Sequence, residues 1–412
     1  MMTQEHRVIL LSRTSTYRSR SFLEAAARLK IDVVQGIDMA PALVDHWQVP
    51  LGVQFDQPEQ AVQQIVDFAH QKPVQAIISL DDSASVIAAK SSQALGLPHN
   101  SSQSALVARN KYEMRKALSA GGARCPAFRL YHINENAAKI ASEQTYPVVI
   151  KPLLLSGSRG VIRVNNRQEF EDAFVRVGRM LAKSGADQIL VENYLPGVEV
   201  ALEGIMDQGK LTVLALFDKP DPLEGPFFEE TIYVTPSRLP EDVQHAITDC
   251  TAQAVKALGL FHGPIHAELR INDDGPWILE VAGRSIGGLC SETLQFGSDM
   301  SLEELILRQA VGLEIETYDR QDHAEGVMMI PIPEAGLLKG YSGCDAAEAI
   351  PLINRVEITA PLNYELIPLP EGDSYLGFIF ASGPTPYDVE MALRQAHAEL
   401  NFQIDPMLSL LT

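Results

Sequence analysis

Cysteine is scarce in this sequence, and the few cysteines are widely separated. Cys125, Cys250, Cys290 and Cys344 are the four in a chain of 412 residues, and no C-x-x-C pair occurs. Such spacing argues against a zinc site or a disulfide framework and fits a reducing compartment. The sequence also lacks an apolar run long enough to span a membrane, and the run near its start is too short for a signal peptide. We therefore expect a cytoplasmic protein with no membrane partner.

Positive charge is in deficit as well. The chain carries 33 basic against 53 acidic residues, which gives a formal net charge of -20. A surface of that sign repels phosphate backbones, so we expect no nucleic-acid partner, and solubility alone accounts for the charge. With 46% hydrophobic residues, the chain is long enough to form two or three domains with ordinary cores.

The first hundred residues alternate between strand and helix patterns. The expected strands lie over 7–11, 31–37 and 74–80, and the expected helices over 19–30, 58–71 and 83–95. Repeated β-α-β units with short connections predict an open parallel sheet covered by helices. Functional groups gather at the carboxyl ends of such strands, and Asp81 and Asp82 stand at one of these ends. The two residues either cap the next helix or face a substrate.

An α+β region is predicted after residue 103. It begins with a helix over 104–123 that carries Lys111, and a long amphipathic helix starts at Arg167. Strands are expected over 128–133, 147–152 and 160–165, and strands of a second sheet over 188–220, 263–272 and 276–284. Proline-bounded strands and a last helix over 386–401 complete the chain. The predicted domains are residues 1–103, 104–185, 186–325 and 326–412.

The stretch YPVVIKPLLLSGSRGVIRV, residues Tyr146–Val164, joins a short strand to a loop of small residues. The strand holds Lys151 in a fixed place. The loop Ser156–Gly160 offers backbone N–H groups that can close around an anion such as a phosphate. The order differs from that of a P-loop, because here the lysine precedes the glycines.

Two glutamates on neighbouring predicted strands form a candidate metal site. Glu268 in HAELR and Glu280 in ILEVAGR are separated by the tight turn NDDGP, which sets the two carboxylates opposite each other on one face. Like charges this close repel unless a cation separates them, and carboxylate oxygens suit Mg²⁺. The alternative is a pair of solvated glutamates, which the apolar neighbours of Glu280 disfavour.

Two arginines accompany the glutamate pair. Arg284 precedes the turn Ser285–Gly288, and Arg270 is expected on the same face as Glu268. Each arginine either clamps a carboxylate or phosphoryl group or merely neutralises a neighbouring glutamate.

Together these motifs resemble the ATP-grasp superfamily. Lys111, PVVIKP with Lys151, SGSRGV, LVENYLPGVEV, HAELR and LEVAGRSIGG occur in the order and approximate spacing of that superfamily, over most of the chain. The tail, with GVMMIPIP and YLGFIFASG, resembles the L-amino-acid ligase branch, the bacilysin-type dipeptide synthetases. The resemblance implies an α/β and α+β architecture with an N-terminal Rossmann-like parallel-sheet domain, two α+β subdomains that clasp ATP, and a C-terminal α+β region.

The resemblance also implies roles for single residues. Glu268 and Glu280 resemble the ligands of Mg²⁺ or Mn²⁺, although many relatives have an asparagine where this chain has Ala282. The implied catalytic residues are Arg284, Arg270 and Lys151. The implied ATP-binding residues are Lys111, Lys151, Ser156, Gly157, Ser158, Gly160, Glu192, Tyr194, Leu195 and Glu199.

An amino-acid pocket is implied by the stretch FFEETIYVTPS. Glu230 and Tyr233 stand at the positions of two residues that line this pocket in the ligase branch, and Glu229 replaces Glu230 if the register slips by one. A glutamate suits an incoming ammonium group by its charge. The other implied substrate-binding residues are Arg284, Gly287 and Gly288.

The implied activity is that of an ATP- and Mg-dependent carboxylate–amine ligase. It would form an amide or peptide bond through an acyl phosphate, joining an amino acid to another amino acid or amine. Its partners would be a small-molecule carboxylate and an amine, and a homodimer is expected because related enzymes commonly dimerise. One alternative is ligation of a purine-type or other small carboxylate. The other is a nucleotide-binding regulator without turnover, which the retained lysines and glutamates disfavour.

Overall fold

A parallel sheet begins the fold, as the alternating pattern predicts. The structure is a computed structural model that describes residues 6–14, 16 and 18–406, so the first five residues of the segment judged too short for a signal peptide lie outside it. The strand order is β3-β2-β1-β4, with parallel pairing throughout. The strands are β1 (Arg7–Ser12), β2 (Asp32–Asp38), β3 (Leu51–Val53) and β4 (Ala76–Ser79).

Helices cover both faces of this sheet because side chains alternate along β1. Val8 and Leu10 pack toward α1, whereas Ile9 and Leu11 pack toward α3 and α4, and all four are almost fully buried. The helical elements of this part are α1 (Ser19–Leu29), η1 (Pro41–Leu43), α2 (Val44–Trp47), α3 (Pro58–Gln71), η2 (Asp82–Ala84) and α4 (Ser85–Leu95).

The prediction of a single helix over 104–123 is wrong, since this segment lies in two helices. α5 (Ser102–Arg109) ends at Asn110, whose backbone is extended, and α6 (Lys111–Ala120) starts at the next residue. The Asn110 side chain accepts hydrogen bonds from two backbone N–H groups in the first turn of α6. When an asparagine side chain accepts the first N–H groups of a new helix, it favours an end of the preceding helix at that residue. The break places Lys111 in the first turn of α6.

An antiparallel sheet of order β5-β8-β6-β7 follows, and β6 carries Lys151 near its end. β8 lies in this sheet, which corrects its assignment to the second sheet, because it pairs with both β5 and β6. The apolar side of α8 packs against this sheet. The elements are β5 (Phe128–His132), α7 (Ala137–Ser142), β6 (Val148–Pro152), β7 (Ile162–Val164), α8 (Arg167–Ala182) and β8 (Gln188–Asn193).

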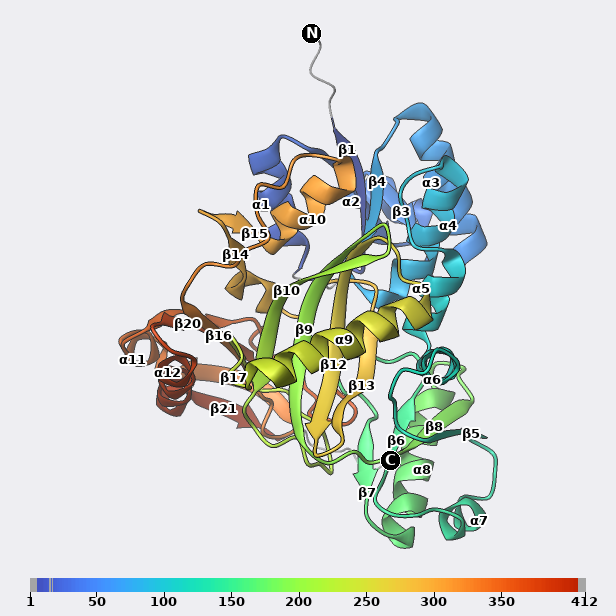
Figure 1. Cartoon of the computed structure of the whole chain (residues 1–412), viewed down its shortest axis with the longest axis vertical. Helices are drawn as coiled ribbons and strands as arrows, with labels where there is room; N and C mark the ends of the chain where they lie inside the picture. Colours follow the sequence, from blue (N-terminus) through green and yellow to red (C-terminus); the bar gives the residue numbers. More distant parts are fainter. Residues whose placement is uncertain (1–5, 15, 17, 407–412) are drawn as a thin grey trace.

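The central sheet has the order β13-β12-β9-β10-β11-β16-β20-β18, and α9 lies across its face at β9, β12 and β13 (Figure 1). Side chains alternate along β12, so Ile265 and Leu269 pack under α9 while His266, Glu268 and Arg270 point to the opposite side. That opposite side forms the floor of the site described below. The elements at this end are β9 (Val198–Asp207), β10 (Lys210–Lys219), β11 (Ile232–Thr235), α9 (Glu241–Leu258), β12 (Gly263–Asn272) and β13 (Gly275–Ala282).

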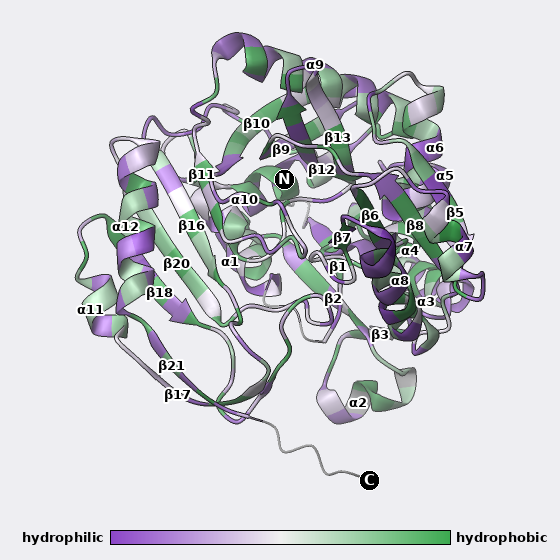
Figure 2. Cartoon of the chain, turned by 90° about the horizontal axis from the view of Figure 1, so that it is seen from below, coloured by the Kyte–Doolittle hydropathy of each residue, from purple (hydrophilic) through white to green (hydrophobic). Residues whose placement is uncertain are grey.

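The last part of the chain extends this central sheet. β16, β20 and β18 continue it beyond β11, and α12 lies along β16 and β20 (Figure 2). A smaller sheet of order β19-β17-β21 packs in the same core. The predicted domain boundaries stay predictions. The elements are η3 (Cys290–Thr293), β14 (Gln295–Phe296), β15 (Met300–Ser301), α10 (Leu302–Val311), β16 (Ala324–Ile330), β17 (Gly336–Ser342), α11 (Cys344–Glu348), β18 (Ile353–Ile358), β19 (Glu365–Leu366), β20 (Gly377–Gly383), α12 (Pro386–Glu399) and β21 (Asn401–Asp405).

No helix in the described part of the chain combines the length and the apolar character needed to cross a membrane.

Candidate active site

A cavity of about 290 Å³ lies where the three parts of the fold meet. Its walls come from the turn after β4, from β6 and its following loop, and from the charged face of the central sheet. All the site residues predicted from sequence line it, with the exception of Gly160: Lys111, Lys151, Ser156, Gly157, Ser158, Glu192, Tyr194, Leu195, Glu199, Glu230, Tyr233, Glu268, Arg270, Glu280, Arg284, Gly287 and Gly288.

Lys151 is held by a buried carboxylate. Its ammonium lies 2.6 Å from Glu192, which also pairs with Arg115 at 2.6 Å. Arg115 has a fully buried side chain and also donates to the carbonyl of Leu279. Burial alone would raise the pKa of Glu192, but Arg115 and Lys151 outweigh it and lower that pKa. Glu192 therefore anchors two cations at the cavity wall, and its predicted contact with ATP is not tested.

Lys111 points from the start of α6 into the same cavity. Its ammonium donates to the carbonyl of Leu155 at 2.9 Å and lies 3.1 Å from Glu280. Lys111 and Lys151 thus approach the loop that follows β6 from two different elements. The arrangement concentrates positive charge where the sequence predicts phosphate.

The predicted hairpin of Glu268 and Glu280 is confirmed. β12 and β13 pair antiparallel with these two residues directly opposite each other, and a bulge follows Glu268. Their side chains are 23% and 28% exposed, so both carboxylates reach the cavity. Such oxygen donors fit a hard divalent cation, and the neighbouring Ala282 offers no further donor. Their assignment as metal ligands stays a prediction.

Arg270 is engaged by the protein itself. Its guanidinium donates to Glu199 at 3.0 Å, and to the Tyr194 hydroxyl and the Leu195 carbonyl, each at 2.9 Å. It also donates to the carbonyl of Leu223. Neutralisation of a neighbouring glutamate, the alternative left open for this arginine, is therefore observed. The same contacts fix Tyr194 and Leu195, two of the residues predicted to bind ATP, and a catalytic role for Arg270 is not tested.

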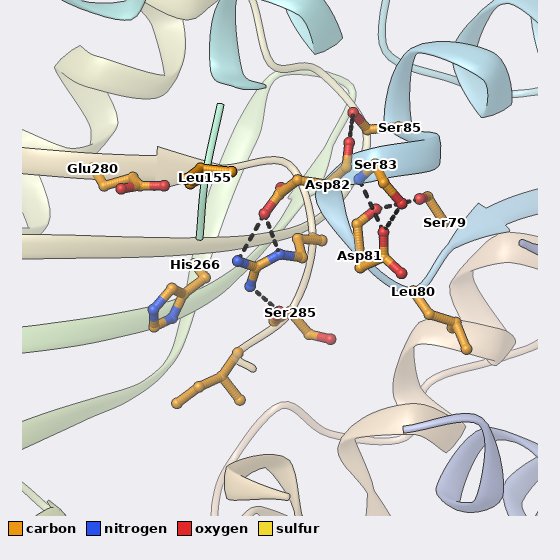
Figure 3. Close-up of polar contacts among 12 residues, drawn as sticks. Ser79, Leu80, Asp81, Asp82, Ser83, Ser85, Leu155, His266, Glu280 and Ser285 are labelled. Atoms are coloured by element: carbon orange, nitrogen blue, oxygen red, sulfur yellow. Dashed lines mark hydrogen bonds and ion pairs between the residues drawn. The ribbon is translucent and has the colours of Figure 1, made fainter. Parts of the chain in front are cut away.

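The two aspartates after β4 have different roles in the structure. Asp81 caps η2, because its carboxylate accepts the backbone N–H of Ser83 at 2.9 Å. Asp82 instead turns its carboxylate toward the segment that precedes Ser285, where Arg284 donates to it at 2.9 Å (Figure 3). Burial would raise the pKa of Asp82, but the Arg284 guanidinium outweighs it and lowers that pKa. Helix capping is thus observed for Asp81, and both aspartates line the cavity.

The predicted amine side of the cavity contains Glu230 and Tyr233. Glu230 lines the cavity and Glu229 does not, which favours the register that names Glu230. Burial raises the pKa of Glu230 to about 7, with Lys219 acting against that shift. Tyr233 is only 2% exposed, and its ring packs beside Phe217.

Four further charged residues form ion pairs or hydrogen bonds at the site: Lys219, Arg115, Asp82 and Arg18. The sequence analysis assigned no role to the three basic residues among them. Arg18 donates to the hydroxyl of Ser285 at 2.6 Å and to the carbonyl of Leu80. It therefore ties the turn after Arg284 to the parallel sheet. No local pattern marks the three basic residues, because their partners lie on other elements of the fold.

The loop after β6 is tied to the last part of the chain. Gly160 donates its backbone N–H to the carbonyl of Pro370 at 2.8 Å, and Arg159 lies 3.2 Å from Asp373. A side chain at Gly160 would place its Cβ 2.7 Å from Pro152. Gly160 thus packs against the end of β6 instead of lining the cavity, so its predicted contact with ATP is not tested.

Three family models match the chain, and each covers one part of this architecture. An ATP-grasp N-terminal domain matches residues 23–99, an ATP-grasp domain matches residues 144–293, and an L-amino acid ligase C-terminal domain 2 matches residues 328–405. The chain therefore belongs to the ATP-grasp superfamily. The last part of the chain matches the C-terminal domain of L-amino acid ligases, and named ligases are among the similar proteins described next.

The chain is similar to several known proteins over all or part of its length. The alanine–anticapsin ligase of Bacillus subtilis is 28% identical over 265 residues, which cover 59% of this chain and 56% of that ligase. An uncharacterized protein of Sinorhizobium fredii, y4rH, is 23% identical over 98% of this chain and 84% of its own length. The crystal structure of an L-amino acid ligase from Bacillus licheniformis superposes with a TM-score of 0.83 and 26% identity, covering 98% of this chain and all of that one. Phosphoribosylglycinamide synthetase from Anaerococcus prevotii, at 17% identity and a TM-score of 0.69, shares the fold.

Proposed function

We propose that the protein is an ATP- and Mg²⁺-dependent ligase that joins the carboxylate of an amino acid to another amino acid or an amine. The observation that supports this best is a single cavity in which Lys111, Lys151 and Arg284 meet Glu268 and Glu280. Cations of this kind stabilise transferring phosphoryl groups, and paired carboxylates suit the metal that accompanies ATP. The proposal places this chemistry in the cytoplasm.

Phosphoryl transfer to the acid is the first step. The substrate carboxylate attacks the γ-phosphate of ATP, and the bond to the β-phosphate breaks, which yields an acyl phosphate and ADP. Lys111 and Lys151 hold the phosphates, and the loop Ser156–Gly160 covers them so that water is excluded. A divalent cation held by Glu268 and Glu280 would offset phosphate charge. Arg284, fixed by Asp82, orients the acid.

Amide formation is the second step. The amine nitrogen attacks the acyl carbon, the bond from that carbon to the phosphate oxygen breaks, and inorganic phosphate leaves. The amine enters as an ammonium and must lose a proton first. Glu230 lines the cavity, and burial raises its pKa to about 7, so its carboxylate can both attract the ammonium and accept its proton.

The purine-type alternative has less support. Similarity to phosphoribosylglycinamide synthetase extends to the fold alone, whereas the C-terminal part matches the L-amino acid ligase domain. A homodimer stays a prediction from the resemblance to related enzymes.

Phosphate release tests the proposal. Purified protein is incubated with ATP, Mg²⁺ and pairs of amino acids, and phosphate and peptide are measured together. We expect both products in equal amounts with a subset of pairs. Glu280→Gln should lower turnover by about 100-fold or more while the circular dichroism spectrum stays that of the wild type. Phosphate release that never yields an amide, or full activity in Glu280→Gln, would contradict the proposal.

A further inference from the structure

Lys219 ends β10 with its ammonium beneath the acidic wall of the cavity. The side chain is 3% exposed and does not line the cavity itself. The ammonium donates to Glu199 at 2.9 Å and to Glu230, and it lies 3.4 Å from Glu268. Of the three N–H donors of the ammonium, two are thus used by Glu199 and Glu230, and Glu268 lies within ion-pair distance. The lysine is therefore buried and placed behind residues that do face the cavity.

The three carboxylates could otherwise bind a metal ion. Within the part of the chain that the structure describes, Glu199, Glu230 and Glu268 form the one group whose ligand atoms lie close enough for this, all within 4.8 Å of one another. Glu280 is not part of the group. Three carboxylates brought together in a buried place repel strongly without a cation among them. Lys219 supplies that cation through a covalently attached side chain.

Other contacts fix the ammonium in place. It lies 5.0 Å from the centre of the Tyr233 ring, within the range of a cation–π contact. Two other basic side chains lie at the same carboxylates: Arg270 binds the second oxygen of Glu199, and His266 lies 3.4 Å from the Glu268 oxygen that Lys219 also approaches. Removal of the ammonium would leave excess negative charge that these two residues do not offset.

We propose that Lys219 is the built-in cation of the Glu199–Glu230–Glu268 cluster, where it excludes a divalent ion and keeps Glu230 available for the ammonium group of the amine substrate. The divalent ion is thereby confined to the neighbouring pair Glu268 and Glu280. The proposed exclusion of metal does not depend on the function of the protein. The proposed effect on the amine substrate rests on the proposed ligase function. Lys219 touches no reacting atom and acts as a positioning residue.

Metal binding without nucleotide tests the exclusion. Mn²⁺ binding to the full chain is measured by titration calorimetry for the wild type, Lys219→Met and Lys219→Arg. Lys116→Met removes an exposed lysine and serves as the matched control. We expect Lys219→Met to gain one Mn²⁺ bound about tenfold or more tightly than any ion on the wild type, because three carboxylates without the ammonium among them form a chelating set. Lys219→Arg and Lys116→Met should bind like the wild type. Equal binding by Lys219→Met and the wild type would overturn the proposal.

Thermal melting covers the case in which Lys219→Met is unstable. Millimolar Mn²⁺ should raise the melting temperature of Lys219→Met more than that of the wild type, because the metal replaces the missing charge. The double variant Lys219→Met/Glu230→Gln should lose both the extra ion and this rescue. If Mn²⁺ stabilises all variants equally, Lys219 has only a packing role and the proposal fails.

Kinetics test the second part. If the protein is active as a ligase, Lys219→Met should raise the KM for the amine while the KM for ATP changes little. Equal changes in both would overturn the effect on the amine. Metal binding does not depend on turnover, so an absence of ligase activity leaves the exclusion test intact.

Discussion

Asp82 and Arg284 lie 202 residues apart and form an ion pair across the cavity wall. One carboxylate oxygen of Asp82 is 2.9 Å from both Nε and Nη2 of the guanidinium. The aspartate comes from the parallel sheet of the N-terminal part, and the arginine follows β13 of the central sheet. The orientation of Arg284, the arginine proposed to bind the acid, therefore depends on how the N-terminal part of the chain is placed against the central sheet.

Substitution of Asp82 tests this link. Asp82→Asn keeps the shape of the side chain and removes its charge, so the guanidinium loses its partner and its fixed orientation. We expect kcat to fall by about tenfold to 100-fold with little change in the KM for ATP. Asp32→Asn, which breaks a surface pair with Arg7, is the control and should not alter kcat. Unchanged kcat in Asp82→Asn would show that Arg284 is oriented by other contacts.

Glu192 offers a prediction about stability. Glu192→Gln would leave the fully buried Arg115 guanidinium without its counter-charge, at a cost of about 3–5 kcal/mol. Thermal melting should show a clear loss, whereas Glu113→Gln, which breaks an exposed pair with Lys116, should stay within about 0.5 kcal/mol of the wild type. Reduced ATP affinity at wild-type stability would instead assign Glu192 to the nucleotide.

The pH dependence of stability can be tested at His397. Burial lowers the pKa of this residue at the end of α12. The unfolded chain, with a histidine pKa of about 6.5, then binds more protons than the folded protein as the pH falls below that value. Stability should therefore decrease as the pH falls through 6.5, and His397→Gln should show a smaller decrease. Melting temperatures of the wild type and of His397→Gln between pH 8 and pH 5.5 measure this loss of stability. Curves that run parallel for the two proteins would contradict the prediction.

Local patterns allowed much of the fold and site to be predicted. Alternation along β12 and the tight turn to β13 placed Glu268 opposite Glu280, because strand periodicity and turn length together set register. The motif order placed Lys151 and Arg284 in one cavity. The break at Asn110 was missed because helical periodicity continues across it, and only the capping hydrogen bonds end the first helix.

The charge network could not be predicted in the same way. Lys219 stands at the end of an apolar strand and looks like an ordinary solvated strand end. Its three carboxylate partners come from β9, β12 and the loop before β11, so their meeting depends on strand order in the central sheet. Arg115 is equally inconspicuous on an amphipathic helix. Tertiary pairing, which has no fixed spacing in the sequence, decides which charges are buried together.

Gly287 and Gly288 both line the cavity but differ in the space around them. A Cβ at Gly288 would lie 3.2 Å from the Phe378 ring and 3.4 Å from the sulfur of Cys290, and the backbone there has a φ of +62°. At Gly287 a Cβ would meet nothing within 4 Å. A bulky side chain can therefore enter the cavity from Gly287 but only with strain from Gly288.

Gly287→Trp should consequently reduce the size of substrate that the cavity accepts. We expect large amino acids to lose kcat/KM by about 10- to 200-fold relative to small ones, as when apolar contacts worth 1–3 kcal/mol are lost, with the KM for ATP unchanged. Gly288→Ala is the matched comparison. Because it strains the backbone instead of filling space, it should lower the melting temperature and affect large and small substrates alike. The measurement is kcat/KM for a series of amino acids of increasing size with each variant. An equal loss for all sizes in Gly287→Trp would place the amino-acid pocket away from this turn.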